Sequence, residues 1–235
     1  DGTFSVSLDA GEAYAVRTLN EPTAGICQPD IHGALITADA DVVVVTGGRG
    51  FSDGDCGTGQ GCGDAGFDMP LPTNFLGITH VVTDPGTNTQ SGEDVIVVAD
   101  TDGTDVSLDT GGGPTDVATL DAGEFYRFQP TTVTRIETSA PVAVYQNGGA
   151  AGCELGMAYI PPLYLAEAPQ TVAFVGATGL TDTVQVVIRS TDEASLRLDG
   201  APLSGETSVP VPGAGGFQFV TFNVSDGAHA VSADS

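Results

Sequence analysis

The side chains most able to do chemistry in this sequence are carboxylates, and two groups of them have spacings that could bind calcium. Asp100, Asp102 and Asp105 occupy positions one, three and six of the segment DTDGTD. Calcium takes oxygen ligands from such loops, but the glycine comes too early for an EF-hand and the distal glutamate is missing. A hairpin turn with solvated acidic side chains explains the same residues, because Asp-Gly pairs are common in hairpins. The second group is Asp53, Asp55 and Asp64, in a glycine-rich loop.

The four cysteines, Cys27, Cys56, Cys62 and Cys153, predict disulfide bonds rather than a zinc site. None forms a CxxC pair, and the three histidines lie far away in sequence, which fits zinc poorly. An even count in an acidic chain with an exported character favours disulfides. Of the three connectivities we favour Cys56–Cys62, which closes the glycine-rich loop, with Cys27–Cys153, which ties the two halves of the chain together. Four unpaired thiols are the alternative.

No pattern for nucleophilic or acid–base catalysis is legible. The sequence has no GxSxG segment and no cysteine beside a histidine, so the usual activated nucleophiles are missing. His32, His80 and His229 are interpreted as strand or loop residues. The glycines of Val42–Gly50 (VVVVTGGRG) resemble a dinucleotide turn, but no helix N-terminus follows to hold a pyrophosphate. We therefore predict a protein that is not an enzyme and has no cofactor unless it binds calcium. A hydrolase site in the Gly47–Gly66 loop is the least favoured alternative.

The charge of the chain is strongly negative. It carries 31 acidic and 6 basic residues, a net charge of −25, and all its basic residues are arginines. Such a surface repels phosphate backbones and anionic membranes, and no apolar run reaches the roughly 20 residues of a membrane span. We expect neither nucleic-acid binding nor membrane insertion. The acidic surface indicates either solubility in a salty extracellular medium or the binding of cations.

The elements that must position these residues are β-strands. Alternating apolar and polar residues, β-branched runs and Gly/Pro/Asp turns predict an all-β antiparallel protein, sandwich-like in preference to propeller-like blades. The apolar run Val42–Val45 is expected at the centre of a sheet, and Asp102-Gly103 is expected to close a hairpin. The helical candidate Leu163–Ala168 is very short. The expected strands are Thr3–Val16, Ala34–Thr46, Ile78–Val82, Asp94–Ala99, Asp105–Leu108, Thr119–Phe128, Val133–Ile136, Val142–Gln146, Met157–Ile160, Thr171–Val175, Thr183–Arg189, Leu196–Leu198 and Gly216–Val224.

The sequence segments that predict these strands recur in the second half of the chain. Leu8–Tyr14 (LDAGEAY) returns as Leu120–Tyr126 (LDAGEFY). Further echoes join Ile36–Val44 to Ile136–Val144, and Asp94–Val98 to Asp182–Ile188. Such self-similarity indicates two diverged copies of one unit, which we assign to residues 1–113 and 114–235. The linker-like segment TGGGP marks the boundary, and the two repeats could together form one compact domain cut from a longer chain.

Several of these segments resemble one known family. They are Asp94–Asp109 (DVIVVADTDGTDVSLD), Leu120–Tyr126, Ser139–Val144 (SAPVAV) and Ile160–Pro162 (IPP). In words and in order they are similar to the N-terminal domain family of the IgG-Fc-binding protein, including its bacterial surface and adhesin-type members. The resemblance runs from about Ile36 to Asp226. It also supports the Cys56–Cys62 pairing, because the family tends to carry a cysteine pair there.

The resemblance implies a β-rich extracellular module for adhesion or ligand binding within a larger surface protein. Its ligand would be a protein or a glycan, or else neighbouring domains or copies of the chain itself. Two departures are expected to matter: the family pattern continues beyond His229–Val231, and the copy at Thr3 starts mid-pattern. An unsatisfied sheet edge would favour strand addition. The alternative function is therefore a structural subunit of an extracellular fibre or surface layer.

Overall fold

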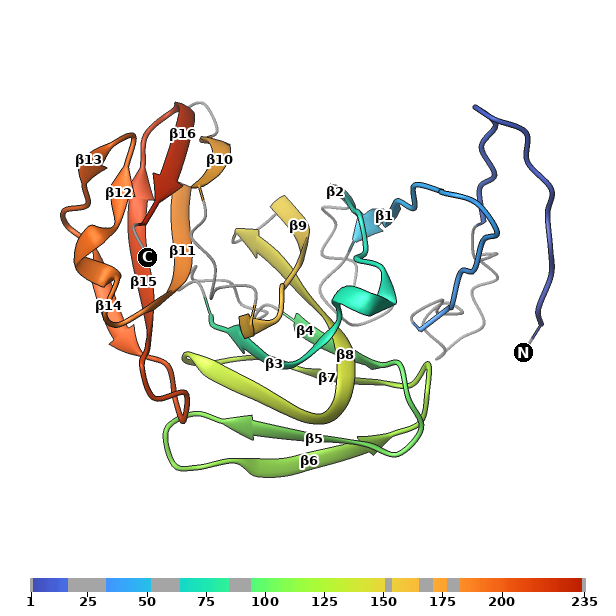
Figure 1. Cartoon of the computed structure of the whole chain (residues 1–235), viewed down its shortest axis with the longest axis horizontal. Coiled ribbons are helices and arrows are strands. Elements are labelled where there is room, and N and C mark those ends of the chain that lie inside the picture. Colours follow the sequence, from blue (N-terminus) through green and yellow to red (C-terminus); the bar gives the residue numbers. More distant parts are fainter. Residues whose placement is uncertain are drawn as a thin grey trace.

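The computed structural model describes residues 2–16, 33–51, 64–84, 94–150, 154–164, 171–176 and 182–233. These residues form antiparallel β-sheets, with two short 3-10 turns at Thr73–Phe75 and Glu193–Ser195 and no α-helix among them. The expectation of an all-β, sandwich-like protein is confirmed. Figure 1 shows a curled central sheet, a C-terminal sandwich beside it and an N-terminal part that projects from the opposite side.

The central sheet is organised around one long strand, β8 (Thr134–Ala150). Its first half pairs with β3 and β5, and its second half pairs with β4 and β9. β6 and β7 then add to the outer edges of β5 and β4, and the sheet curls as β8 bends (Figure 1). The other strands are β3 (Gly77–Val82), β4 (Asp94–Ala99), β5 (Thr104–Asp109), β6 (Thr115–Leu120), β7 (Phe125–Phe128) and β9 (Glu154–Tyr159).

The prediction that Asp102-Gly103 closes a hairpin is wrong. β4 and β5 do not pair with each other, and both run antiparallel to β8, one after the other. The turn between them is a corner in what is otherwise one long strand. The turn Asp121–Glu124 between β6 and β7 is the matching corner of the next strand. Gly103 N donates to Asp121 Oδ1 at 3.3 Å, and Ala122 N donates to Asp102 Oδ1 at 2.9 Å. The two corners thus hold each other.

The concave side of the curl holds the main core. Val95, Val97 and Ala99 alternate along β4 and are almost fully buried, as the period of two requires. They pack with buried residues of the neighbouring strands. Those partners are Val82, Val106, Leu120, Ile136, Val142 and Val144.

The C-terminal strands form a separate sandwich of two small sheets. One sheet has the order β10-β16-β12-β13 and the other the order β11-β15-β14. Ile188 and Phe222 of one sheet and Val231 of the other share a buried core. The strands are β10 (Thr171–Gly176), β11 (Asp182–Arg189), β12 (Arg197–Leu198), β13 (Ala201–Pro202), β14 (Thr207–Pro210), β15 (Phe217–Val224) and β16 (Gly227–Ser232).

The sandwich packs against the central sheet. Val81 of β3 shares a small buried cluster with Val211 and Phe219. The loop that follows β14 also reaches the central sheet, since a Cβ on Gly213 would lie 2.1 Å from a guanidinium nitrogen of Arg135. The two parts therefore contact each other directly.

The two longest N-terminal strand predictions are wrong for the described residues. Thr3–Val16 and most of Ala34–Thr46 run without strand pairing, and strand structure begins with β1 (Thr46–Phe51), which pairs with β2 (Asp64–Asp68). Val42–Val45, expected at the centre of a sheet, is largely exposed, with Val43 81% accessible. Among the described residues, no strand pairs with Val42–Val45 to cover it. Most of Leu163–Ala168 lies outside the described residues.

The two LDAGE motifs adopt the same turn. In each, the backbone N–H of the aspartate donates to the glutamate carboxylate: Asp9 N donates to Glu12 Oε2 and Asp121 N to Glu124 Oε2, both at 2.9 Å. The glycines have φ of 87° and 82°, a conformation that favours glycine. The duplication of the whole unit stays a prediction. At its proposed boundary, the TGGGP segment is the loop of the paired hairpin β5–β6.

Candidate functional site

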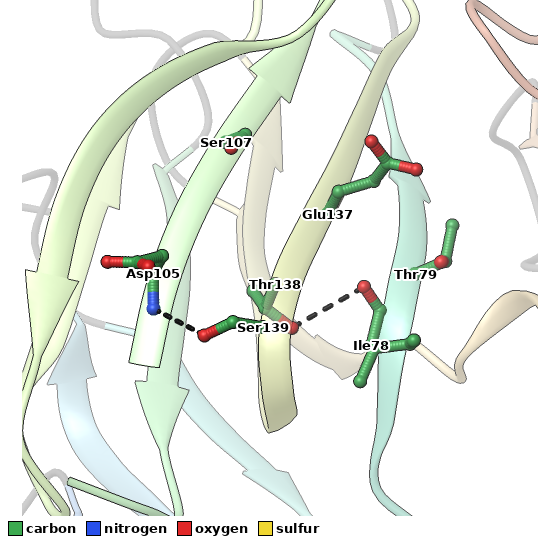
Figure 2. A pocket seen from close by; sticks show the side chains of 7 residues that line it. All are labelled: Ile78, Thr79, Asp105, Ser107, Glu137, Thr138 and Ser139. Atoms are coloured by element: carbon green, nitrogen blue, oxygen red, sulfur yellow. Dashed lines mark hydrogen bonds between the residues drawn. The ribbon is translucent and has the colours of Figure 1, made fainter. Parts of the chain in front are cut away.

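A polar pocket of about 280 Å³ lies across β5, β8 and β3, beside the bend of β8. Figure 2 shows its side chains projecting from these three strands. Every side chain that lines it, apart from one isoleucine, is a carboxylate or a hydroxyl. The lining residues are Ile78, Thr79, Asp105, Ser107, Glu137, Thr138 and Ser139.

Strand register places three of these side chains in a row. Thr79 of β3 pairs with Glu137 of β8, and Glu137 pairs with Ser107 of β5. Directly paired residues put their side chains on the same face of the sheet, with Cβ atoms about 5 Å apart. Glu137 therefore stands between two hydroxyls. We call the outward side chains of Thr79, Asp105, Ser107, Glu137 and Ser139 the polar face.

Hydrogen bonds fix the carboxylate end of the polar face. Asp105 N donates to Ser139 Oγ at 2.8 Å (Figure 2), and Asp105 Oδ1 accepts from Thr119 Oγ1 at 2.7 Å. Ser107 Oγ donates to Asp116 Oδ1 at 2.7 Å. These bonds link β6, β5 and β8 across the sheet. The hydroxyls and carboxylates are thus held in place before any ligand arrives.

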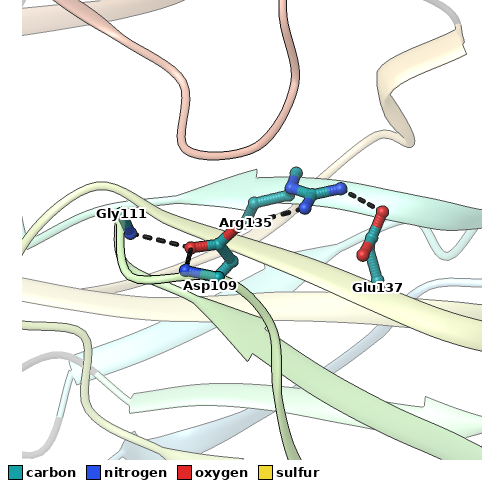
Figure 3. A network of polar contacts seen from close by, with 5 residues as sticks. Asp109, Gly111, Arg135 and Glu137 are labelled. Atoms are coloured by element: carbon teal, nitrogen blue, oxygen red, sulfur yellow. Dashed lines mark hydrogen bonds and ion pairs between the residues drawn. The ribbon is translucent and has the colours of Figure 1, made fainter.

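An ion-pair network anchors Glu137 from the other side (Figure 3). Arg135, two residues earlier on the same face of β8, pairs with Glu137 Oε1 and with Asp109 Oδ2, the latter at 3.2 Å. The Arg135 and Asp109 side chains are 9% and 3% exposed, whereas that of Glu137 is 41% exposed. The bond from Gly111 N, helped by Arg135 and Gly113 N, holds the pKa of Asp109 below its ordinary value, although burial opposes this. Asp109 therefore stays ionised and orients Arg135 through their ion pair.

This arrangement leaves one carboxylate oxygen free to bind a ligand. Glu137 uses Oε1 for Arg135, and Oε2 has no partner in the described part of the chain. A ligand that brings hydrogen-bond donors or positive charge would satisfy it. Among the described residues, no histidine lines the pocket. Sequence analysis overlooked the polar face. The signal was the alternation of Asp105, Ser107 and Asp109 along β5, and of Arg135 and Glu137 along β8.

The structure scatters the first predicted calcium group. Asp102 and Asp105 use their carboxylates for Ala122 N and Thr119 Oγ1, and Asp105 alone of the three lines the pocket. Among the residues that the structure describes, no three His, Cys, Asp or Glu side chains are grouped to hold a metal ion. Calcium binding by Asp100, Asp102 and Asp105 stays a prediction, and the geometry gives it no support.

Of the remaining predicted site residues, the structure describes only Asp64, whose backbone begins β2. Asp53 and Asp55 are outside the described residues, and so are all four cysteines. The Cys56–Cys62 and Cys27–Cys153 pairings therefore stay predictions.

The two described histidines lie in β3 and β16. His80 is fully buried, neither of its ring nitrogens has a hydrogen-bond partner among the described residues, and burial lowers its pKa to about 4. His229 Nδ1 bonds Asp199 Oδ2 at 2.8 Å, and this contact raises the pKa of His229. Its Nε2 meets the carbonyl oxygen of Ser225 rather than a hydroxyl.

Comparison with known proteins assigns the chain to a family. The family model of the IgGFc binding protein matches residues 1–235, the whole chain, so the chain belongs to that family. The resemblance seen in the sequence is confirmed, and its bacterial surface type stays a prediction. No curated protein and no solved structure matches the chain. In the described residues, no helix is long and apolar enough to cross a membrane.

Proposed function

We propose that this member of the IgGFc binding protein family is a non-enzymatic adhesion or ligand-binding module of a larger extracellular or cell-surface protein. Its ligand-binding surface is the polar face of β5, β8 and β3. The observation that carries the proposal is Glu137, half-exposed between Thr79 and Ser107 and anchored from behind by Arg135. Groups fixed in this way lose little conformational entropy when a ligand binds. The family name, which describes binding, supports the same conclusion.

The chemistry of the polar face favours a protein ligand with basic or amide donors. Glu137 and Asp105 present acceptors, and the whole chain adds a net charge of −25, which steers cationic partners toward it. No aromatic side chain lines the pocket, so a stacking platform for a sugar ring is absent from it. A glycan ligand is the less favoured alternative.

Binding measurements with matched variants test the proposal. The chain is immobilised and probed with an IgG Fc fragment and with a panel of basic extracellular proteins at about 0.15 M salt, where long-range charge effects are screened beyond about 8 Å. Glu137→Gln and Asp105→Asn are expected to weaken a specific partner about 10-fold or more, because a charged hydrogen bond contributes about 1.5–3 kcal/mol. Glu206→Gln is the control, since it removes one exposed charge far from the polar face in sequence.

The outcomes separate a site from a diffuse charge effect. Equal losses in all three variants would show that net charge alone attracts the partner, and the polar face would lose its role. Thermal unfolding of each variant checks that Glu137→Gln has not disturbed the Arg135 network. Saturable turnover of any substrate by the purified chain would contradict the non-enzymatic proposal.

A second candidate function is a structural subunit of an extracellular fibre or layer. The observation that favours it is the N-terminal part, which pairs with no strand among residues 2–16 and 33–45 and exposes alternating apolar side chains. Phe4, Val6 and Leu8 are 47–61% accessible, and Leu35 and Ile36 are 62–70% accessible. Exposed strand-like segments of this kind are sites of intermolecular pairing. Sedimentation with calcium and again with a chelator tests it: species that vanish on chelation would show that calcium bridges the acidic loops.

A further inference from the structure

Three strand pairings of the central sheet recur in the C-terminal sandwich. β3 with β8, β4 with β7 and β5 with β8 correspond to β10 with β16, β11 with β15 and β12 with β16. The core residues agree. Val95, Val97 and Ala99 of β4 face the central core, and Val184, Val186 and Ile188 of β11, each 89 positions later, face the sandwich core. β11 is thus the counterpart of β4.

The two counterparts differ in one neighbour. β4 lies between β7 and β8, whereas β11 is an edge strand whose one partner in the described part of the chain is β15. The difference shows in burial: Val95 and Val97 are fully buried, while Val184 and Val186 are only half-buried. The outer edge of β11, opposite β15, is the position that the second half of β8 occupies on β4.

A segment with the matching sequence has no strand partner among the described residues. Ile36–Val44 echoes Ile136–Val144, so Val42 and Val44 correspond to Val142 and Val144 of β8. The segment Asp41–Val45 is not part of a strand, and Val42 is 55% accessible. It leads directly into the β1–β2 hairpin, as the second half of β8 leads into its pairing with β9.

We propose that Asp41–Thr46 of one copy of this chain adds as a strand to the outer edge of β11 in a second copy. The register is the one that β8 takes on β4, where Val97 pairs with Val144 and Ala99 with Val142. The β11 residues lie 89 positions after their β4 counterparts, and the Ile36–Val44 residues lie 100 positions before their β8 counterparts. The same register therefore sets Val44 against Val186 and Val42 against Ile188. Two apolar side chains then cover the half-exposed side of the sandwich core.

The same register gives a charge match. It places Asp41 across from Arg189, one position beyond the Val42–Ile188 pair. Opposite charges that face each other across antiparallel strands stabilise the pair by about 0.2–1 kcal/mol, and like charges oppose it. The match favours this register over one shifted by a residue, which would also turn Val42 and Val44 away from the core.

The partner is a second copy because the donor and acceptor lie at opposite ends of one molecule. In Figure 1 the segment before β1 is at the right of the view, and β11 is in the sandwich at the left. Each copy therefore offers one donor and one acceptor, a head-to-tail contact that builds open chains unless the geometry closes a ring. The net charge of −25 opposes assembly, so salt that screens it should promote growth.

Sedimentation velocity over a range of protein concentrations tests the inference, at about 0.15 M and about 1 M salt, where the screening length falls from about 8 to about 3 Å. The unmodified chain should form oligomers that lengthen with concentration and salt. Val44→Asp should weaken association at least about 10-fold, because it buries an unpaired charge against the sandwich core. Val209→Asp is the control. It makes the same change on exposed β14, two strands from the acceptor edge.

A charge exchange makes the test independent of folding defects. Asp41→Arg and Arg189→Asp should each weaken assembly severalfold, and an equimolar mixture of the two variants should restore it, because every contact between unlike copies then joins opposite charges. A chain that stays monomeric at every concentration and salt overturns the inference, and so does assembly unchanged by Val44→Asp. Binding at the polar face is measured on the same variants, so failure of assembly and failure of the proposed binding function are distinguishable.

Discussion

Gly213 lies in the loop that packs on the Arg135–Asp109 ion pair, and its replacement by alanine should disrupt this packing. The loop passes over Arg135 in Figure 3. Gly213 has φ of +62°, and a Cβ there would lie 2.1 Å from Arg135 Nη2 and 2.5 Å from Asp109 Oδ2. Both neighbours are buried and paired to each other. Neither can withdraw without breaking the pair, so the loop must lift or the pair must separate.

The expected cost has two parts. An alanine with left-handed φ costs about 1–2 kcal/mol, of which about 0.4–1 kcal/mol is regained from the stiffer unfolded chain. Separation of a buried ion pair adds up to about 3–5 kcal/mol, because a charge is left buried without its partner. We expect Gly213→Ala to lower the free energy of unfolding by at least about 2 kcal/mol more than a glycine replacement that meets no neighbour.

Gly205→Ala is the matched control. Gly205 has φ of +81° with no atom within 4 Å of the added Cβ, so it carries the backbone cost alone. Urea unfolding of both variants gives the comparison, with the midpoint and slope fitted separately. Equal stability losses for the two variants would refute the view that the loop packs on the ion pair.

The remaining predictions concern the corners and the two histidines. Asp102→Ala and Asp121→Ala should each lower the free energy of unfolding by about 1 kcal/mol, and a double-mutant cycle should show coupling between the interlocked corners. Acidification should destabilise the protein as pH falls from 6.5 towards 4, because burial lowers the pKa of His80 to about 4 and its neutral form is needed for folding; His80→Leu should flatten this dependence in urea midpoints. The sign reverses at His229, whose raised pKa gives stability that is complete below the unfolded pKa and lost as pH rises through the folded one. Asp199→Asn removes the charged partner of His229 and should reduce this loss of stability at rising pH. Asparagine tolerates the φ of 53° at that position.

The sequence predicted strands well where one face is buried by the chain's own neighbours. Asp94–Ala99 matches β4 residue for residue, because its apolar run lies between two partner strands. Thr3–Val16 has an equally clear alternation but pairs with no strand in the part of the chain that the structure describes. A pattern of period two specifies which face could be buried, and the burial itself depends on segments distant in sequence.

The prediction of a hairpin turn from local sequence failed because strand pairing elsewhere in the fold decides how the turn is used. Asp102-Gly103 fits a hairpin, yet β8 pairs with both flanking strands and converts the turn into a corner. The alternation of polar residues along β5 and β8 can be read in the sequence, but it does not show that these strands place their polar sides together. Thr79, Ser107 and Glu137 are distant in the chain, and only the register of three strands brings them together.

Hydrogen exchange with and without a bound partner shows directly whether the polar face is the binding surface. A protein ligand identified in the binding panel is added at saturation, and amide protection is mapped along the chain. We expect additional amide protection in β3, β5 and the first half of β8, which carry Thr79, Ser107 and Glu137, and unchanged protection in β14. Protection confined to other strands, with these three unaffected, would contradict the assignment of the polar face as the binding surface.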